Sequence, residues 1–193
     1  MTKWLSHRMV ERGIIKEEEQ ELYQFGIRNG MILLLNVVTA LVIGLLTEQL
    51  AVVAVFTLSF MVLRSYTGGY HSDSRIFCYL GSNLVLLVPV YTQAVFYKTS
   101  LARLLAVLLV SAGIIFLLSP MHSKNRKLDK EEQKHFGRKA RLIAVLELAV
   151  LGILWYAGQV LYAYAVYTGI CITALFMIVG KAQLWIQSHT ENG

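Results

Sequence analysis

The run VLYAYAVYTGICITALFMIVG, at residues 160–180, carries no charged side chain and decides the class of fold. A helix that crosses about 30 Å of hydrocarbon needs about 20 residues of this kind, with roughly 17 to 25 tolerated. Five further runs have the same character: 29–47, 49–63, 76–97, 104–121 and, interrupted by Glu147, 142–157. Arg64 and Arg141 can snorkel to extend the two short runs. The sequence therefore predicts an all-α polytopic membrane protein with about six transmembrane helices.

The composition of the 193-residue chain agrees with a membrane protein. Hydrophobic residues make up 56% of the chain and charged residues only 16%, against roughly 25% charged residues in soluble domains. This composition excludes a disordered chain and a collagen, and the two cysteines, Cys78 and Cys171, cannot form a disulfide framework. Because no linker composition interrupts the chain, we expect a single integral membrane domain over residues 1–193.

The positive charge is concentrated between two predicted spans, at residues 121–141. This segment holds eight basic and three acidic side chains, so it accounts for +5 of the net charge of +6. The basic side chains are Lys124, Arg126, Lys127, Lys130, Lys134, Arg138, Lys139 and Arg141. One such loop favours the cytoplasmic face of a membrane over nucleic acid as its partner. With six spans, both termini and the loop at 64–75 lie on that same face.

Residues 1–28 precede the first apolar run and mix five basic with five acidic side chains. Because they contain no apolar core of the kind found in signal peptides, we expect no cleaved signal peptide here. Their apolar residues are spaced loosely, as in an amphipathic helix that lies at the membrane surface. We predict such an interfacial helix, broken near Gly13.

The densest polar stretch outside the termini and the basic loop is RSYTGGYHSDSRIFC, at residues 64–78. Backbone that is not helical survives at membrane depth only if it is buried in protein or lines a wet cavity. Gly68 and Gly69 therefore suggest a re-entrant or interfacial turn between the second and third spans. This turn would place a site at the cytoplasmic face.

His71 and Cys78 are the pair that a cysteine nucleophile requires, because a nearby imidazole can remove the proton of the thiol. On a continuous helix, residues seven positions apart would lie about 10 Å from each other, so the chain between them must bend. The N–H groups of Gly68 and Gly69 are candidate oxyanion donors. Asp73 or Ser82 could orient the imidazole, and the spacing does not choose between them.

Other interpretations of the polar residues stay open. A histidine and a cysteine at the edge of a span are often an interfacial side chain and a packing residue. Cys171 lies in an apolar run and is expected to pack, whereas Glu147 is either a functional group or a partner in helix packing. No cluster has metal-ligand spacing, and we predict neither a metal nor a cofactor.

The pattern Arg64-x3-Gly68-Gly69-x-His71-x6-Cys78, on a chain with six predicted spans, resembles the accessory gene regulator protein B (AgrB) family of membrane endopeptidases. The resemblance implies that His71 and Cys78 are catalytic and that the motif arginine and glycines support them. It also implies a homodimer in the bacterial cell membrane. The implied substrate is a quorum-sensing propeptide of the AgrD type.

The resemblance further implies that Cys78 cleaves the propeptide towards its C-terminal side and forms a thioester, which a Cys or Ser of the peptide converts into a ring. The basic loop either only orients the protein or also docks acidic residues of the propeptide through Lys124, Arg126 and Lys127. The alternative function is a non-catalytic membrane transporter or adaptor. A transporter needs polar groups at mid-span, and the sequence offers only Glu147 and two asparagines.

Overall fold

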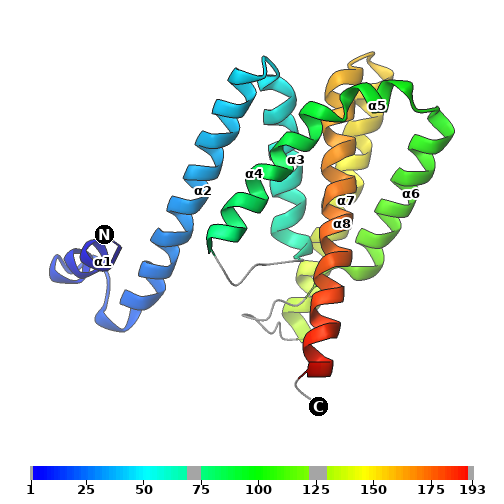
Figure 1. Ribbon diagram of the computed structural model, residues 1–193. Helices are drawn as coiled ribbons and strands as arrows, with labels where there is room; N and C mark the ends of the chain where they lie inside the picture. Colours follow the sequence, from blue (N-terminus) through cyan, green and yellow to red (C-terminus); the bar gives the residue numbers. More distant parts are fainter. Residues whose placement is uncertain (1, 69–74, 122–129, 191–193) are drawn as a thin grey trace. The chain divides into compact units, whose positions relative to one another are not determined.

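The computed structural model describes residues 2–68, 75–121 and 130–190 (Figure 1). The described residues form helices and no strand, which confirms the predicted all-α class. In chain order the elements are α1 (Thr2–Glu11), η1 (Glu17–Glu19), α2 (Gln20–Leu46), α3 (Leu50–Thr67), α4 (Arg75–Tyr91), α5 (Gln93–Lys98), α6 (Leu101–Leu118), α7 (Lys130–Tyr156) and α8 (Val160–Thr190).

The chain forms two compact units, Met1–Thr39 and Ala40–Gly193, and the boundary between them lies within α2. The first unit contains α1, η1 and the first part of α2. The helix α1 ends at Glu11, and Gly13 follows with a φ of 67°, so the predicted break near Gly13 is confirmed. The location of α1 at a membrane surface and the single-domain organisation stay predictions.

Among the described residues, four helices are long and apolar enough to cross a membrane: α2, α3, α6 and α8. The helix α3 is longer than the 49–63 run, because it continues to Thr67. The helix α7 contains the 142–157 run up to Tyr156, but its first half is charged. The apolar part of α4 is short, at Tyr79–Tyr91. The chain is thus a membrane protein with several spans, and the count of six stays a prediction.

The predicted span at 76–97 is wrong as a single helix, because Thr92 separates α4 from α5. Pro89 has no N–H to donate to the preceding turn, and its ring crowds that turn. Two hydrogen bonds use carbonyl groups near this break: Thr92 Oγ1 donates to Val88 O and the Tyr164 hydroxyl donates to Pro89 O, each at 2.8 Å. The carbonyl oxygen of Val88 also accepts the N–H of Thr92 at 3.0 Å, so the bond from Tyr164 is the one that supplies a side-chain partner for a carbonyl group at the break, that of Pro89.

The helix α8 is central in the second unit and contacts α3, α4, α6 and α7 (Figure 1). A Cβ built on Gly169 of α8 would lie 2.6 Å from Oγ of Ser59 on α3, so the two helices approach closely there. Small residues allow this kind of packing between membrane helices. Two clusters of buried side chains lie along α8, one around Tyr164 and the other around Met177.

Gly169→Ala is expected to destabilise the protein by about 1–3 kcal/mol, because overpacking of a close contact has costs of this size. Gly113→Ala on α6 is the control, because a Cβ at Gly113 meets no atom within 4 Å. The measurement is thermal unfolding of both full-length variants in detergent, followed by circular dichroism. Equal melting temperatures would contradict the close packing of α8 against α3.

Candidate active site

Gly68 ends α3 in a backbone conformation that is essentially restricted to glycine. Its φ is 72° and its ψ is −152°. Its N–H donates to the carbonyl oxygen of Arg64 at 3.3 Å and so closes the helix. In this structure the Gly68 N–H is therefore engaged, and the other candidate oxyanion donor, Gly69, lies outside the described residues.

The residues that follow α6 hold the end of α3. The N–H of Met121 donates to the carbonyl oxygen of Thr67 at 2.9 Å. A Cβ on Gly68 would lie 2.7 Å from the carbonyl oxygen of Met121, so space as well as conformation requires a glycine there. Gly68 and Met121, the residues that directly precede the segments 69–74 and 122–129, therefore lie close together.

Arg64, the arginine of the motif, connects the end of α3 to α8. Its Nη1 donates to the carbonyl oxygen of Gly68. Its guanidinium carbon lies 5.3 Å from the centroid of the Phe176 ring on α8, within the range of a cation–π interaction. Phe60 meets the same ring edge-on, with centroids 5.8 Å apart. Arg64 thus binds the carbonyl group from which the 69–74 segment continues.

The described parts of the basic segment 121–141 approach the same end of α3. Lys139 Nζ on α7 lies 6.0 Å from the centroid of the Tyr66 ring on α3. A Cβ on Gly137 would lie 3.0 Å from Cδ of Pro120, so α7 also packs closely on the chain that leaves α6. Positive charge and the start of the 69–74 segment therefore occur at one end of the second unit.

The helix α4 begins at Arg75, so Cys78 lies in its first turn. The N–H groups of a first turn have no partner within the helix, and the helix dipole favours negative charge near them. Ser82 follows Cys78 by four residues, about one helical turn. The role of Ser82 in orienting an imidazole stays a prediction.

The remaining predicted site residues lie outside the described part of the chain: Gly69, His71, Asp73, Lys124, Arg126 and Lys127. Nothing in the described residues tests their roles. The bend between His71 and Cys78 and the re-entrant or interfacial turn therefore stay predictions.

Glu147 has a partner that the sequence analysis did not identify. Ser59 Oγ on α3 donates to Glu147 Oε2 on α7 at 2.6 Å. The only signal in the sequence was Glu147 itself, because an ionisable side chain within a span needs a polar partner. Ser59 shares its run with two other polar residues, Gln49 and Thr57, so the sequence did not distinguish it as that partner. The hydrogen bond supports the helix-packing interpretation of Glu147.

Comparison with known proteins identifies relatives of the chain. The family model of Accessory gene regulator B matches residues 1–179. A protein of Clostridium perfringens strain SM101 described as AgrB-like is 23% identical over 148 residues, which cover 74% of this chain and 69% of that protein. The accessory gene regulator protein B of Staphylococcus intermedius is 27% identical over 128 residues, covering 64% and 68% respectively. No solved structure matches the chain.

Gly68→Ala is expected to destabilise the protein more than Gly158→Ala. Both glycines have a positive φ, 72° and 73°, so both substitutions strain the backbone by about 1–3 kcal/mol. Only Gly68 also has a neighbour in the way, the carbonyl oxygen of Met121, whereas a Cβ at Gly158 meets nothing within 4 Å. Thermal unfolding in detergent compares the two variants. A smaller loss for Gly68→Ala would contradict the contact between the end of α3 and Met121.

Proposed function

We propose, because the chain belongs to the accessory gene regulator B family, that it is a membrane-embedded cysteine endopeptidase that cleaves an AgrD-like quorum-sensing propeptide. The family gives the chain a role in processing the quorum-sensing peptide of the accessory gene regulator system. The cysteine chemistry is the further step of the proposal. The observation that carries it is the position of Cys78 in the first turn of α4.

In the proposed reaction, the Cys78 thiolate attacks the carbonyl carbon of the scissile peptide bond, while His71 holds the proton of the thiol. The C–N bond breaks, the leaving amine takes the proton from His71, and the N-terminal part of the propeptide stays on Cys78 as a thioester. A thiol or hydroxyl group of the same peptide then attacks the thioester and closes the ring. The proton that this group loses returns through His71 to Cys78.

The first turn of α4 suits this chemistry. A thiolate near a helix N-terminus is stabilised by the helix dipole and by the free N–H groups of the first turn. A thioester must also be kept from water if ring closure is to compete with hydrolysis. A semi-buried site at the cytoplasmic membrane face would limit the access of water, which favours attack by the tethered peptide group.

The end of α3 supports a substrate-binding role for the basic segment 121–141. The Met121–Thr67 hydrogen bond brings the beginning of this segment to the beginning of the 69–74 segment. Lys139 lies against Tyr66 at the same end. We therefore assign the docking of acidic propeptide residues to Lys124, Arg126 and Lys127. A homodimer with both termini in the cytoplasm completes the proposal.

Cys78→Ala and Cys78→Ser are expected to lower propeptide cleavage by more than about 10³-fold, because they remove the nucleophile. His71→Ala is expected to lower it by about 10²–10⁴-fold, because it removes the base. Cys171→Ala, within α8, is the matched control and keeps most of the activity. The full-length variants are co-expressed with a tagged AgrD-type propeptide from the same genome, and the peptide products are measured by mass spectrometry.

Mass spectrometry of the purified protein also looks for an acyl group on Cys78. Cleavage by the Cys78→Ala protein would overturn the cysteine-peptidase proposal. Absence of cleavage by every form, including the unmodified protein, would favour a transporter or adaptor.

Replacement of Lys124, Arg126 and Lys127 by glutamine is expected to raise KM at least about threefold at low salt, because each of three exposed ion pairs contributes about 0.2–1 kcal/mol. The difference is expected to shrink as salt screens the charges. The control carries Lys124→Arg, Arg126→Lys and Lys127→Arg. It keeps the positive charge and is expected to keep the KM of the unmodified protein. Cysteine-accessibility labelling at positions 123 and 190 verifies that the topology is unchanged. An unchanged KM with unchanged topology would exclude the docking role.

A further inference from the structure

One face of α3 and its C-cap carries four residues that lie four positions apart: Phe56, Phe60, Arg64 and Gly68. Side chains at this spacing are neighbours along a helix, about 5–6 Å apart. The rings of Phe56 and Phe60 are stacked, with centroids 5.8 Å apart and planes 6° from parallel. Phe56 is fully buried, so this face leads from the core of the second unit to Gly68 at the end of α3.

Phe176 of α8 contacts this face between Phe60 and Arg64. Its ring meets the Phe60 ring edge-on at 5.8 Å, and the guanidinium carbon of Arg64 lies 5.3 Å from its centroid. A guanidinium can lie over a ring and still donate hydrogen bonds, because its N–H groups project in its own plane. One of these groups, on Nη1, donates to the carbonyl oxygen of Gly68. The Phe176 ring therefore supports the side chain that binds this carbonyl group.

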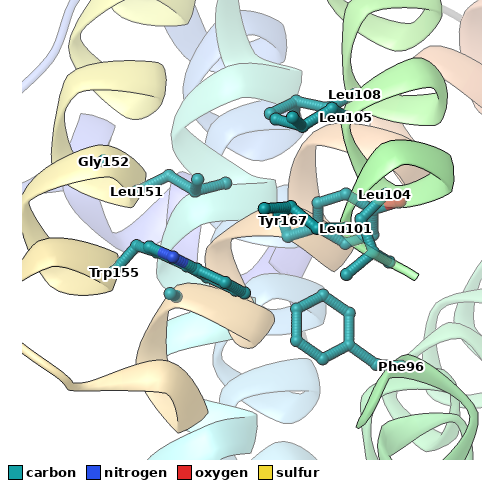
Figure 2. A pocket seen from close by; sticks show the side chains of 10 residues that line it. Phe96, Leu101, Leu104, Leu105, Leu108, Leu151, Gly152, Trp155 and Tyr167 are labelled. Atoms are coloured by element: carbon teal, nitrogen blue, oxygen red, sulfur yellow. The ribbon is translucent and has the colours of Figure 1, made fainter. Parts of the chain in front are cut away.

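The aromatic residues Tyr167 and Phe176 of α8 have different surroundings. Tyr167 lines an apolar pocket of about 270 Å³ between α6 and α7, together with leucines of both helices (Figure 2). All ten described residues that line this pocket are uncharged. Phe176 lies nine positions further along α8 and meets a cation instead. A cation over the face of an aromatic ring is attracted by it, and most strongly where water is excluded.

The packing of α8 on α3 determines where the Phe176 ring lies. Gly169 and Phe176 are seven positions apart, about two helical turns, so they share one face of α8. A Cβ on Gly169 would lie 2.6 Å from Ser59 Oγ of α3, and Thr173, between the two residues, is fully buried. The face of α8 that packs closely on α3 is thus the face that carries Phe176.

The carbonyl oxygen of Gly68 accepts hydrogen bonds from two side chains, Arg64 Nη1 and Thr67 Oγ1, the second at 3.4 Å. Thr67 is fully buried, and its own carbonyl oxygen accepts the N–H of Met121. The carbonyl group of Gly68 and the N–H group of Gly69, a candidate oxyanion donor, belong to one peptide group, and a peptide group is planar. A side chain that holds the oxygen of such a group therefore also affects the direction of its N–H.

We propose that Phe176 is a positioning residue of the peptidase: its ring holds Arg64 on the carbonyl oxygen of Gly68 and thereby orients the peptide group that leads into the 69–74 segment. This inference rests on the proposed function, because it assigns Phe176 a role in the reaction of Cys78. An oxyanion donor acts on the charge that develops in the transition state. Loss of its orientation therefore lowers kcat and leaves KM unchanged.

The test compares two substitutions of Phe176. Phe176→Leu removes the aromatic face and keeps an apolar side chain, whereas Phe176→Tyr keeps the ring. The matched control is Phe116→Leu on α6, because Phe116 is also half-buried and packs against the buried cluster around Met177. The measurement is kcat and KM for cleavage of an AgrD-type propeptide by the full-length proteins in detergent, at equal concentrations of folded protein from size-exclusion chromatography.

Phe176→Leu is expected to lower kcat about fivefold to thirtyfold, which corresponds to a cation–π interaction at a desolvated site. KM is expected to change less than about twofold. Phe176→Tyr and Phe116→Leu are expected to keep kcat within about twofold of the unmodified protein, since the first retains the ring and the second leaves Arg64 untouched.

Hydrogen exchange provides a second measurement that needs no substrate. The amide hydrogens of Gly68 and Met121 are donated to the carbonyl oxygens of Arg64 and Thr67, so their exchange reports how firmly the end of α3 is held. Phe176→Leu is expected to raise their exchange rates at least about threefold, and Phe116→Leu to leave them unchanged. In an Arg64→Lys background, which lacks the planar guanidinium, Phe176→Leu is expected to add less than about twofold.

Cleavage by the unmodified protein together with an unchanged kcat in Phe176→Leu would overturn the role of Phe176 and leave the proposed function intact. Equal losses in Phe176→Leu and Phe116→Leu, or in Phe176→Leu and Phe176→Tyr, would show a packing role and also contradict it. Absence of cleavage by the unmodified protein would overturn the proposed function and the catalytic role of Phe176 with it. The exchange rates would still decide whether the ring holds the end of α3.

Discussion

The contact between α3 and α8 at Ser59 and Gly169 determines how the helices of the second unit assemble. Membrane helices are not driven together by burial of apolar surface, because the lipid around them is equally apolar. Close packing and hydrogen bonds between helices therefore carry the association. Gly169 allows the backbone of α8 to approach α3, and the Ser59 hydroxyl then reaches Glu147 on α7. One small residue and one hydroxyl thus connect three helices.

The position of the candidate active site follows from this packing. Packing against α7 and α8 fixes the position of α3 and of its last turn. Arg64 in that turn donates a hydrogen bond to the carbonyl oxygen of Gly68, and its guanidinium stacks on the Phe176 ring of α8. Met121 then joins the chain that leaves α6 to Thr67. Both segments assigned to catalysis and substrate binding therefore begin on helices whose relative positions are set by close contacts, as a precise reaction requires.

The two ends of the second unit differ in chemistry. The end with Gly68 and Met121 is polar and basic and belongs to the segments proposed to meet a peptide. The opposite end has an apolar pocket lined by leucines of α6 and α7, and the aromatic side chains Tyr97, Trp155 and Tyr156 are exposed there. The two ends of the second unit therefore differ in polarity.

The sequence by itself determined the class of the protein, because the need to satisfy every backbone group in lipid leaves long apolar helices as the simple solution. Uncharged runs located α6 and α8, and the 64–78 motif indicated the family. Local patterns of this kind depend on neighbouring residues only. They did not reveal the division at Thr92, where the Tyr164 hydroxyl of α8 binds the Pro89 carbonyl.

Only the tertiary structure decided which side chains meet across helices. Hydropathy does not specify the rotation and axial position of each helix, and these two quantities decide whether Ser59 faces Glu147 or lipid. The same holds for the Met121–Thr67 hydrogen bond, which joins residues 54 positions apart in the sequence, and for the pocket, which needs five leucines from two helices to surround one space. Such contacts arise from packing, which the order of residues along one helix does not record.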